Sequence, residues 1–231
     1  MTGFSGFVWV ALPYLAIATF VLGHVWRYRH DKFGWTTRST QMLESRWLAW
    51  GSNLFHWGAL AAIGGHVLGI LIPADLTAAV GIDEARYHIL SSAAGTVAGL
   101  VCGGGLVILV WRRLGFLRVW RTTTYVDVAT YVLLIVIITL GLIDTIWFNT
   151  IQGGYDYRHT VAAWFRGIFL LDPRPDLMLT APLVYQLHAA SAWLLFALWP
   201  FSRLVHAWSL PFQYLGRPYI LYRSRYAATR R

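Results

Sequence analysis

Apolar residues dominate five long stretches of the chain, and each stretch holds few Lys, Arg, Asp or Glu. They run over residues 4–26, 47–72, 88–111, 128–148 and 183–207. A helix needs about 20 mostly apolar residues to cross the hydrocarbon of a bilayer, and all five stretches are long enough. The pattern therefore predicts an all-α fold, a single-domain integral membrane bundle of five transmembrane helices over residues 1–231. The first stretch is predicted to be a span rather than a removable signal peptide, because it is long and lacks a basic start.

The polar segments between the stretches are short, except for the loop from Asn149 to Pro182. Within this loop, TVAAWFRGIFLL has the pattern of an amphipathic helix that would lie on the membrane. The third stretch contains AAGTVAGLVCGGG, whose small residues would let a neighbouring helix or a flat cofactor approach closely. After the fifth stretch, residues 208–231 form a basic and aromatic tail in which Pro211 and Pro218 oppose a long helix.

The composition agrees with a membrane protein, since 57% of the 231 residues are hydrophobic and the mean hydropathy is +0.52. The formal net charge of +9 is unevenly distributed. The cations of the segments after stretches one, three and five are Arg27, Arg29, Lys32, Arg38, Arg46, Arg112, Arg113, Arg118, Arg121, Arg217, Arg223, Arg225, Arg230 and Arg231, and Arg203 lies at the end of the fifth stretch on the same side. The other side has Arg86, Arg158, Arg166 and Arg174. Because short basic loops stay in the cytoplasm, we expect the N-terminus outside and the C-terminus inside.

This distribution favours anionic lipid or an acidic protein partner on the inner face, and argues against a nucleic-acid partner. Cys102 is the only cysteine and lies in the third stretch, so the chain has no disulfide and no cysteine-ligated cluster. Any iron–sulfur or flavin chemistry would therefore belong to another chain.

Histidines mark the second and fifth stretches. Residues 52–69 read SNLFHWGALAAIGGHVLG and carry His56 and His66 without any charged residue. A polar ring is costly in hydrocarbon unless something binds it. The fifth stretch carries His188 near the outside and His206 near the cytoplasm. Because the two helices would be antiparallel, the sequence predicts two pairs at two depths, His66 with His188 and His56 with His206.

Two imidazoles from facing helices are what a six-coordinate haem iron requires. On a continuous helix, His188 and His206 would share one face, while His56 and His66 are only roughly aligned. The spacings within the two stretches differ, about 15 Å against about 27 Å, and a bend at Pro200 would absorb part of the difference. A tetrahedral zinc site is less well matched, because each depth offers only two ligands. Hydrogen-bonded core histidines remain an alternative, as does a histidine-based transporter, although the sequence has no inverted repeat.

Three segments carry a family resemblance: SNLFHWGALAAIGGHVLGILIP, WRRLGFLRVWRTTTYVD and WPFSRLVHAWSLPFQYLGRPYILYRSR. Nearly from end to end, the sequence resembles the gamma, or cytochrome b, subunit of membrane-bound respiratory nitrate reductase. The resemblance implies two b-type haems, an outer one held by His66 and His188 and an inner one held by His56 and His206. It implies oxidation of menaquinol or ubiquinol beside the outer haem. Electrons would then pass to an iron–sulfur beta subunit and a molybdenum-containing alpha subunit, at the cell membrane of a prokaryote.

The resemblance also implies roles for further residues. Gly65 and His66 match positions that line the quinol site, and Arg86 stands where well-known members carry a lysine. The residues that match positions near haem propionates are Arg27, Tyr28 and Arg113. An alternative within the same chemistry is a cytochrome subunit that serves a heterodisulfide or sulfite-type reductase.

Each of two titratable residues near the outer side has two possible interpretations from the sequence. Asp144, near the outer end of the fourth stretch, is either a proton exit or a polar helix-end residue that faces outer water. His88 is either an interfacial residue or part of a quinol site.

Overall fold

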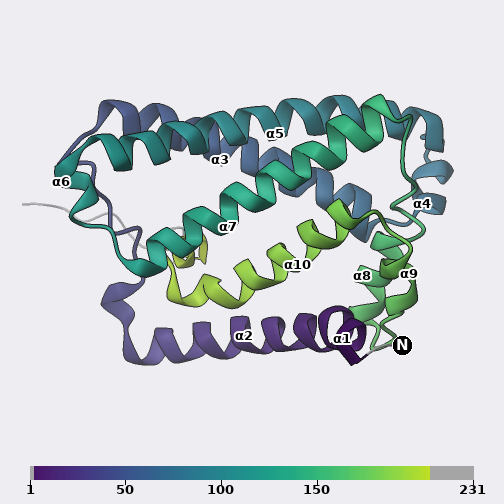
Figure 1. Ribbon diagram of the computed structural model, residues 1–231, viewed down its shortest axis with the longest axis horizontal. Coiled ribbons are helices and arrows are strands. Elements are labelled where there is room, and N and C mark those ends of the chain that lie inside the picture. Colours follow the sequence, from purple (N-terminus) through teal and green to yellow (C-terminus); the bar gives the residue numbers. More distant parts are fainter. Residues whose placement is uncertain (1–2, 209–231) are drawn as a thin grey trace, which may run out of the picture.

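A computed structural model describes residues 3–208, and this part of the protein is helical without any strand (Figure 1). The α-helices are α1 (Gly3–Gly6), α2 (Leu12–His30), α3 (Arg46–His66), α4 (Ala74–Ala79), α5 (Glu84–Gly115), α6 (Leu117–Trp120), α7 (Tyr125–Leu142), α8 (Val161–Phe169), α9 (Pro175–Leu179) and α10 (Leu183–Leu198). The π-helical segments are η1 (Phe7–Ala11), η3 (Val67–Leu71) and η4 (Ile143–Ile151). The 3₁₀ turns are η2 (Lys32–Gly34), η5 (Trp199–Phe201) and η6 (Arg203–Trp208). The predicted tail, apart from Trp208, lies outside the described residues.

Four continuous helical stretches are long and apolar enough to cross a membrane in the described part of the chain. They are Gly3–His30, Arg46–Leu71, Glu84–Gly115 and Tyr125–Ile151. They coincide with the first four stretches predicted from hydropathy. The longest, α5, has 32 residues. At about 1.5 Å per residue it measures about 48 Å, so it extends beyond a hydrocarbon layer of about 30 Å.

The fifth predicted stretch differs from the expectation. Helix α10 has 16 residues and ends at Leu198, where the chain enters η5, extended Ser202 and then η6. The physical reason is Pro200, which lacks a backbone N–H and whose ring collides with the carbonyl four residues earlier in a regular helix. The expectation that His188 and His206 share one face of one helix is therefore wrong, whereas a bend at Pro200 is present.

The closest packing in the bundle is between α3 and α5. A Cβ atom added to Gly58 would lie 2.4 Å from the backbone nitrogen of Cys102, and one added to Gly105 would lie 2.3 Å from that of Phe55. The small residues of the third stretch therefore allow the two backbones to touch, as the sequence predicted.

Helix α10 lies between α7 and α2 and packs on both (Figure 1). Helices α3 and α10, which carry three of the four predicted ligand histidines, are not among the closely packed element pairs of the described region. The histidine pairs consequently meet between two groups of helices, α3 with α5 on one side and α10 with α2 on the other, and α7 packs on both α5 and α10.

The two ends of the bundle are built differently (Figure 1). We call the end with α4, α8 and α9 the α8 end, and the end with α6, η2 and η6 the α6 end. At the α8 end the predicted amphipathic helix is present as α8. Its apolar face is packed inside the protein rather than on the membrane, because Trp164 is 1% exposed and donates a hydrogen bond to the Trp9 carbonyl at 2.9 Å.

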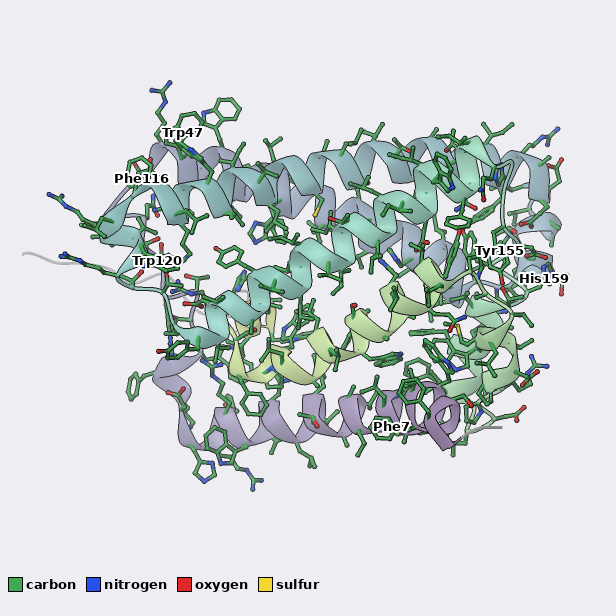
Figure 2. All side chains as sticks on the ribbon, in the orientation of Figure 1. Phe7, Trp47, Phe116, Trp120, Tyr155 and His159 are labelled. Carbon is green, nitrogen blue, oxygen red and sulfur yellow. The ribbon has the colours of Figure 1, made fainter. Side chains whose placement is uncertain are left out.

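Aromatic side chains lie at both ends, with Trp47, Phe116 and Trp120 at the α6 end (Figure 2), as is typical of membrane interfaces.

Candidate functional site

The structure brings the four histidines of the second and fifth stretches together in two pairs. His66, the last residue of α3, faces His188 of α10 with ring centres 6.0 Å apart and planes inclined by 11°. His56, further back on α3, faces His206 of η6 with ring centres 5.8 Å apart and planes inclined by 68°. These are the two pairings predicted from depth along antiparallel segments.

Each of the four rings makes a backbone hydrogen bond through Nδ1. The acceptors are the carbonyls of Ser52 for His56 (2.7 Å), Ala62 for His66 (2.7 Å), Ile137 for His188 (3.0 Å) and Arg203 for His206 (2.6 Å). A carbonyl can only accept, so the ring proton is assigned to Nδ1 and the lone pair to Nε2. That tautomer is the one a metal-bound histidine uses, with the other nitrogen held by a carbonyl or carboxylate.

Two other histidines serve as internal comparisons. His24 and His30 make the same type of Nδ1 bond, to the carbonyls of Phe20 and Trp26. Their ring contacts in the described part of the chain are with tryptophan and phenylalanine rather than histidine. The opposed pairing, and not the Nδ1 bond alone, therefore distinguishes the four candidate ligands.

The spacing of the rings fits a metal shared by two imidazoles. A metal about 2 Å from one nitrogen of each ring, on opposite sides, places the ring centres about 6 Å apart. Within residues 3–208, no cluster of three or more His, Cys, Asp and Glu side chains is placed to hold an ion. Two protein ligands on opposite sides suit a planar group that supplies the other four ligands, such as a haem, better than a tetrahedral zinc ion.

A cavity of about 420 Å³ adjoins the pair at the α6 end. Both His56 and His206 line it, together with three arginines, Arg112, Arg113 and Arg203. The volume falls within the range of sites for small molecules and cofactors, about 300–1,000 Å³.

The three arginines of this cavity have different partners. Arg112 is paired with Glu44 at 2.5 Å and Arg203 with Asp127 at 2.6 Å. Arg113 is 6% exposed and donates to neutral hydroxyls, those of Thr123 at 2.9 Å and Tyr131 at 3.3 Å. The Asp127 carboxylate lies in the same cavity and interacts with Arg113 electrostatically, but it is hydrogen-bonded to Arg203, so the Arg113 guanidinium is suited to a carboxylate on a bound group.

The loop before α3 is fixed to this cavity through Glu44. Burial raises the pKa of the Glu44 carboxyl, but the backbone N–H groups of Trp47 and Leu48 and the Arg112 guanidinium lower it by more. The resulting pKa lies below the usual range, so Glu44 is ionised when it bonds Arg112.

The structure gives Arg27 a position next to the segment that carries His206. Its guanidinium donates to the carbonyls of Pro200 at 2.6 Å, Ser202 at 3.1 Å and Gly34 at 2.5 Å. Tyr28 is exposed, with the Lys32 ammonium 5.2 Å from its ring centre. Neither Arg27 nor Tyr28 lines the cavity that contains Arg113.

The residues predicted for quinol lie at the other pair. Gly65 is exposed beside His66, with open space where a side chain would be. Arg86 is 73% exposed at its side chain, donates to the Gly81 carbonyl at 3.0 Å and lies 3.5 Å from Asp83. Its contacts are therefore local to the start of α5, and the structure does not bring it against His66.

Helix α7 contributes contacts that the sequence analysis missed. The His188 ring bonds the Ile137 carbonyl, and a Cβ atom on Gly141 would lie 3.0 Å from His188 Cε1. Gly141 thus leaves the space that the His188 ring occupies. The only sequence signal for this was a glycine within the otherwise large and apolar run of the fourth stretch.

An all-helical membrane protein with two histidine pairs at two depths is the class defined by this fold and site. The family model for the nitrate reductase gamma subunit matches residues 5–225. The chain is 45% identical to the nitrate reductase gamma chain of Bacillus subtilis, over 94% of this chain and 97% of that one. It is 34% identical to the respiratory nitrate reductase 1 gamma chain of Escherichia coli, over 93% and 95% of the two chains. A nitrate reductase-like protein of Mycobacterium tuberculosis, NarX, is 46% identical over 94% of this chain and 33% of its own length. The chain belongs to the nitrate reductase gamma subunit family.

Proposed function

We propose that this chain is the dihaem cytochrome b subunit that oxidises quinol for a respiratory nitrate reductase complex. His66 and His188 hold the outer b-type haem, and His56 and His206 hold the inner one. The observation that carries the proposal is the two opposed histidine pairs, with ring centres 6.0 and 5.8 Å apart and the Nδ1 of each ring bonded to a carbonyl. When bound, the two haems supply one-electron transfer between a quinol and the partner subunits.

The membrane topology follows from the same arrangement. In this proposal α10, together with η5 and η6, makes the fifth pass of a single membrane domain. Helix α10 alone has 16 residues, about 24 Å, so the 3₁₀ segments complete the crossing. Arg38, Arg118 and Arg121 lie in the segments of the α6 end, which supports a cytoplasmic position for that end and an external one for the N-terminus. The membrane is the cell membrane of a prokaryote.

The chain's own residues hold and tune the two sites. The Nδ1 bonds fix the four rings in the tautomer that leaves Nε2 free. Arg113 pairs with a haem carboxylate in the cavity at the α6 end, and Arg27 positions the turn that presents His206. Tyr28 lies on the same side and remains a candidate for the inner propionates. Two histidines at each site would leave a bound haem iron no open position, which would suit electron transfer rather than oxygen chemistry.

Quinol oxidation is assigned to the pair at the α8 end. The open face of α3 at Gly65 and His66 gives a flat head group access to that ring. Arg86, near the start of α5, would need to turn from Asp83 to reach a quinone oxygen. Protons released here stay outside while electrons move toward the α6 end, which separates charge across the membrane potential at about 2.3 kcal/mol per charge per 100 mV.

The electrons leave the chain at the α6 end. The partners in this proposal are an iron–sulfur beta subunit and a molybdenum-containing alpha subunit, where nitrate is reduced. Support comes from the family and from its relatives, two of which are named as respiratory nitrate reductase gamma chains. The cationic surface of the α6 end is suited to an acidic protein.

The test is an optical spectrum of membranes that contain the chain with its native partners. A quinol analogue should produce b-type haem bands, and nitrate should reoxidise them. His66→Ala should lose one haem and quinol-driven reduction, and His56→Ala should lose the other haem. His30→Ala is the matched control, because His30 is exposed, bonds the Trp26 carbonyl of its own helix and stacks on the Trp26 ring. Both haems at full occupancy in His66→Ala would refute the pairing, and bands that nitrate leaves reduced would refute the acceptor.

A further inference from the structure

Buried polar atoms without hydrogen-bond partners gather at the α8 end. In the described part of the chain, four such atoms are Asp144 Oδ1, Tyr185 Oη, Tyr155 Oη and His88 Nε2. A buried polar atom left unpaired costs about 1–3 kcal/mol, so native proteins usually supply ordered water or a ligand. Four of them in one region indicate a hydrated site rather than a packing defect.

Asp144 is the innermost member of this group. Its residue is 6% exposed, so it does not face outer water, which excludes the interpretation of a solvated helix end. It lies in η4, the π-helical continuation of α7, and π segments inside helices are frequent at functional sites. It is three residues beyond Gly141, the residue against which the His188 ring lies. Asp144 is therefore close to the proposed outer haem without touching a ligand histidine in any contact of the structure.

Tyr185 and Tyr155 continue the group toward the surface. The Tyr185 hydroxyl lies in the electrostatic field of Asp144, and the ring centres of Tyr185 and Tyr155 are 5.0 Å apart. The Asn149 carbonyl oxygen accepts the Tyr155 backbone N–H at 3.3 Å, and the Asn149 side chain also lies within reach of the Tyr185 hydroxyl, so it links the two tyrosines. Figure 2 shows Tyr155 at the α8 end, next to the loop that carries His159.

A small polar cavity completes the connection to water. It has a volume of about 20 Å³, and its lining includes Tyr155, His88, Glu84 and Asp156. A cavity needs about 10–15 Å³ to hold one water molecule, which also needs polar partners, and both conditions are met. Glu84 and Asp156 have side chains 55% and 61% exposed, so they mark the outer rim.

The cavity wall is held in place by hydrogen bonds of Arg158 and Tyr157. Arg158 is 2% exposed and bonds Glu84 at 3.0 Å and the Thr77 hydroxyl at 3.0 Å. Burial and the hydrogen bond with Tyr87 raise the pKa of Tyr157, so this hydroxyl keeps its proton. These hydrogen bonds fix the wall, while Arg158 Nε, which lines the same cavity, has no hydrogen-bond partner in the described part of the chain and is a further group available to bind water.

We propose that Asp144, Tyr185, Tyr155 and His88, with ordered water, form the path by which protons leave the quinol oxidation site. The proposal rests on the proposed function. Oxidation of one quinol to a quinone releases two electrons, which go to the one-electron haem acceptors, and two protons. Each proton is taken by the Asp144 carboxylate, relayed through the tyrosine hydroxyls and the water beside His88, and released to outer water at Glu84 and Asp156. Asp144 is then ionised again, so protons pass one at a time.

The experiment uses the whole complex in membranes and compares Asp144→Asn, Tyr155→Phe and Asp75→Asn. Asp75 is the matched control, because it is an exposed carboxylate at the same end. The rate of haem reduction by a quinol analogue is measured by stopped flow, and haem content by the dithionite-reduced spectrum. We expect Asp144→Asn to slow quinol-driven reduction about 100-fold, the low end of what a positioned proton-transfer group contributes. Tyr155→Phe should slow it less, and Asp75→Asn should match the wild type.

Two readouts separate a proton path from a structural role. Haem content and the dithionite-reduced spectrum should be unchanged in Asp144→Asn and Tyr155→Phe, and the slowed step should be further retarded in deuterated water. Wild-type rates in Asp144→Asn with both haems present would overturn the proposal. If Asp144→Asn loses haem, the Tyr155→Phe variant becomes the test. A wild-type rate of haem reduction in Tyr155→Phe would then overturn the proposal. Failure of the proposed function is distinguishable, because quinol would then reduce no haem even in the wild-type complex.

Discussion

Substitution of Gly141 by alanine should weaken the proposed haem site of His66 and His188 and leave the other proposed site intact. Gly141 is on α7, and a Cβ atom there would lie 3.0 Å from His188 Cε1 and 3.4 Å from Nδ1. The ring must move by a few tenths of an ångström to accept the methyl group. The same ring is held by the 3.0 Å bond from Nδ1 to the Ile137 carbonyl, so movement lengthens this bond and turns Nε2 away from His66.

The magnitude can be estimated from these contacts. Overpacking of one methyl group costs about 1–3 kcal/mol, and weakening a neutral hydrogen bond costs up to about 1 kcal/mol. Replacing glycine by alanine inside a helix returns about 1 kcal/mol. The net cost of about 2 kcal/mol corresponds to about 30-fold weaker retention of the group held by His188.

The assay is haem release to an apo-protein acceptor, followed by the optical bands of the two haems, at several temperatures. Gly104→Ala is the matched control, because it makes the same change in a neighbouring span and its Cβ atom meets nothing within 4 Å. We expect one of the two haems to be lost faster in Gly141→Ala and neither in Gly104→Ala. Equal release of both haems from Gly141→Ala and wild type would refute the role of α7 in placing His188.

Two further predictions concern the frame around the site. Gly105→Ala should lower the melting temperature of the detergent-solubilised protein, at a cost of about 3 kcal/mol or more in stability. The reason is that its Cβ atom would lie 2.3 Å from the backbone nitrogen of Phe55, which cannot move away. Gly103→Ala is the control and should change the melting temperature little, because its Cβ atom would lie 3.5 Å from the nearest neighbour. Glu44→Gln should cost about 2 kcal/mol in the same assay, because it removes the charge that bonds Arg112 at 2.5 Å. Since the folded pKa of Glu44 is lowered, its contribution is present above about pH 4.3 and is lost as pH falls through the folded value. The melting temperature of the wild type should therefore fall more steeply on acidification than that of Glu44→Gln. Parallel curves of melting temperature against pH would contradict this account.

Much of the architecture could be predicted from hydropathy. The first four spans are present because each is a long run of side chains that hydrocarbon tolerates, and this property is summed over about 20 residues. The end of α10 could not be found in this way, since Trp199, Phe201 and Leu204 continue the apolar pattern past Pro200. One proline breaks a helix without changing the mean hydropathy around it.

The histidine pairs could also be predicted, because antiparallel helices place residues at matching depths whatever their exact tilt. The residues that surround each ring could not be predicted from the sequence. The Ile137 carbonyl and Gly141 reach His188 from a helix more than 40 positions earlier in the chain. Asp144 is likewise buried, with Tyr185 of another helix as its neighbour, and nothing in the fourth stretch itself signals that.

The two histidine pairs differ in what fixes their positions. His66 and His188 stand on regular α-helices, and His188 is held by a third helix. His206 stands on a short 3₁₀ segment whose place depends on loops, through Arg27 bonds to the Pro200 and Ser202 carbonyls.

The same segment is tied down a second time by Arg203. Its guanidinium pairs with Asp127 of α7 and donates to the Arg38 carbonyl at 2.7 Å, in the loop before α3. These loops form the α6 end, where the proposed function places the partner subunits. A partner subunit bound at the α6 end would contact the loops that hold the His206 segment. The pair of His66 and His188 lies at the other end of α3 and α10, away from such a contact. If the proposed function holds, we expect the site of His56 and His206 to respond to assembly of the complex, and the site of His66 and His188 to respond to quinol and to the groups around Asp144.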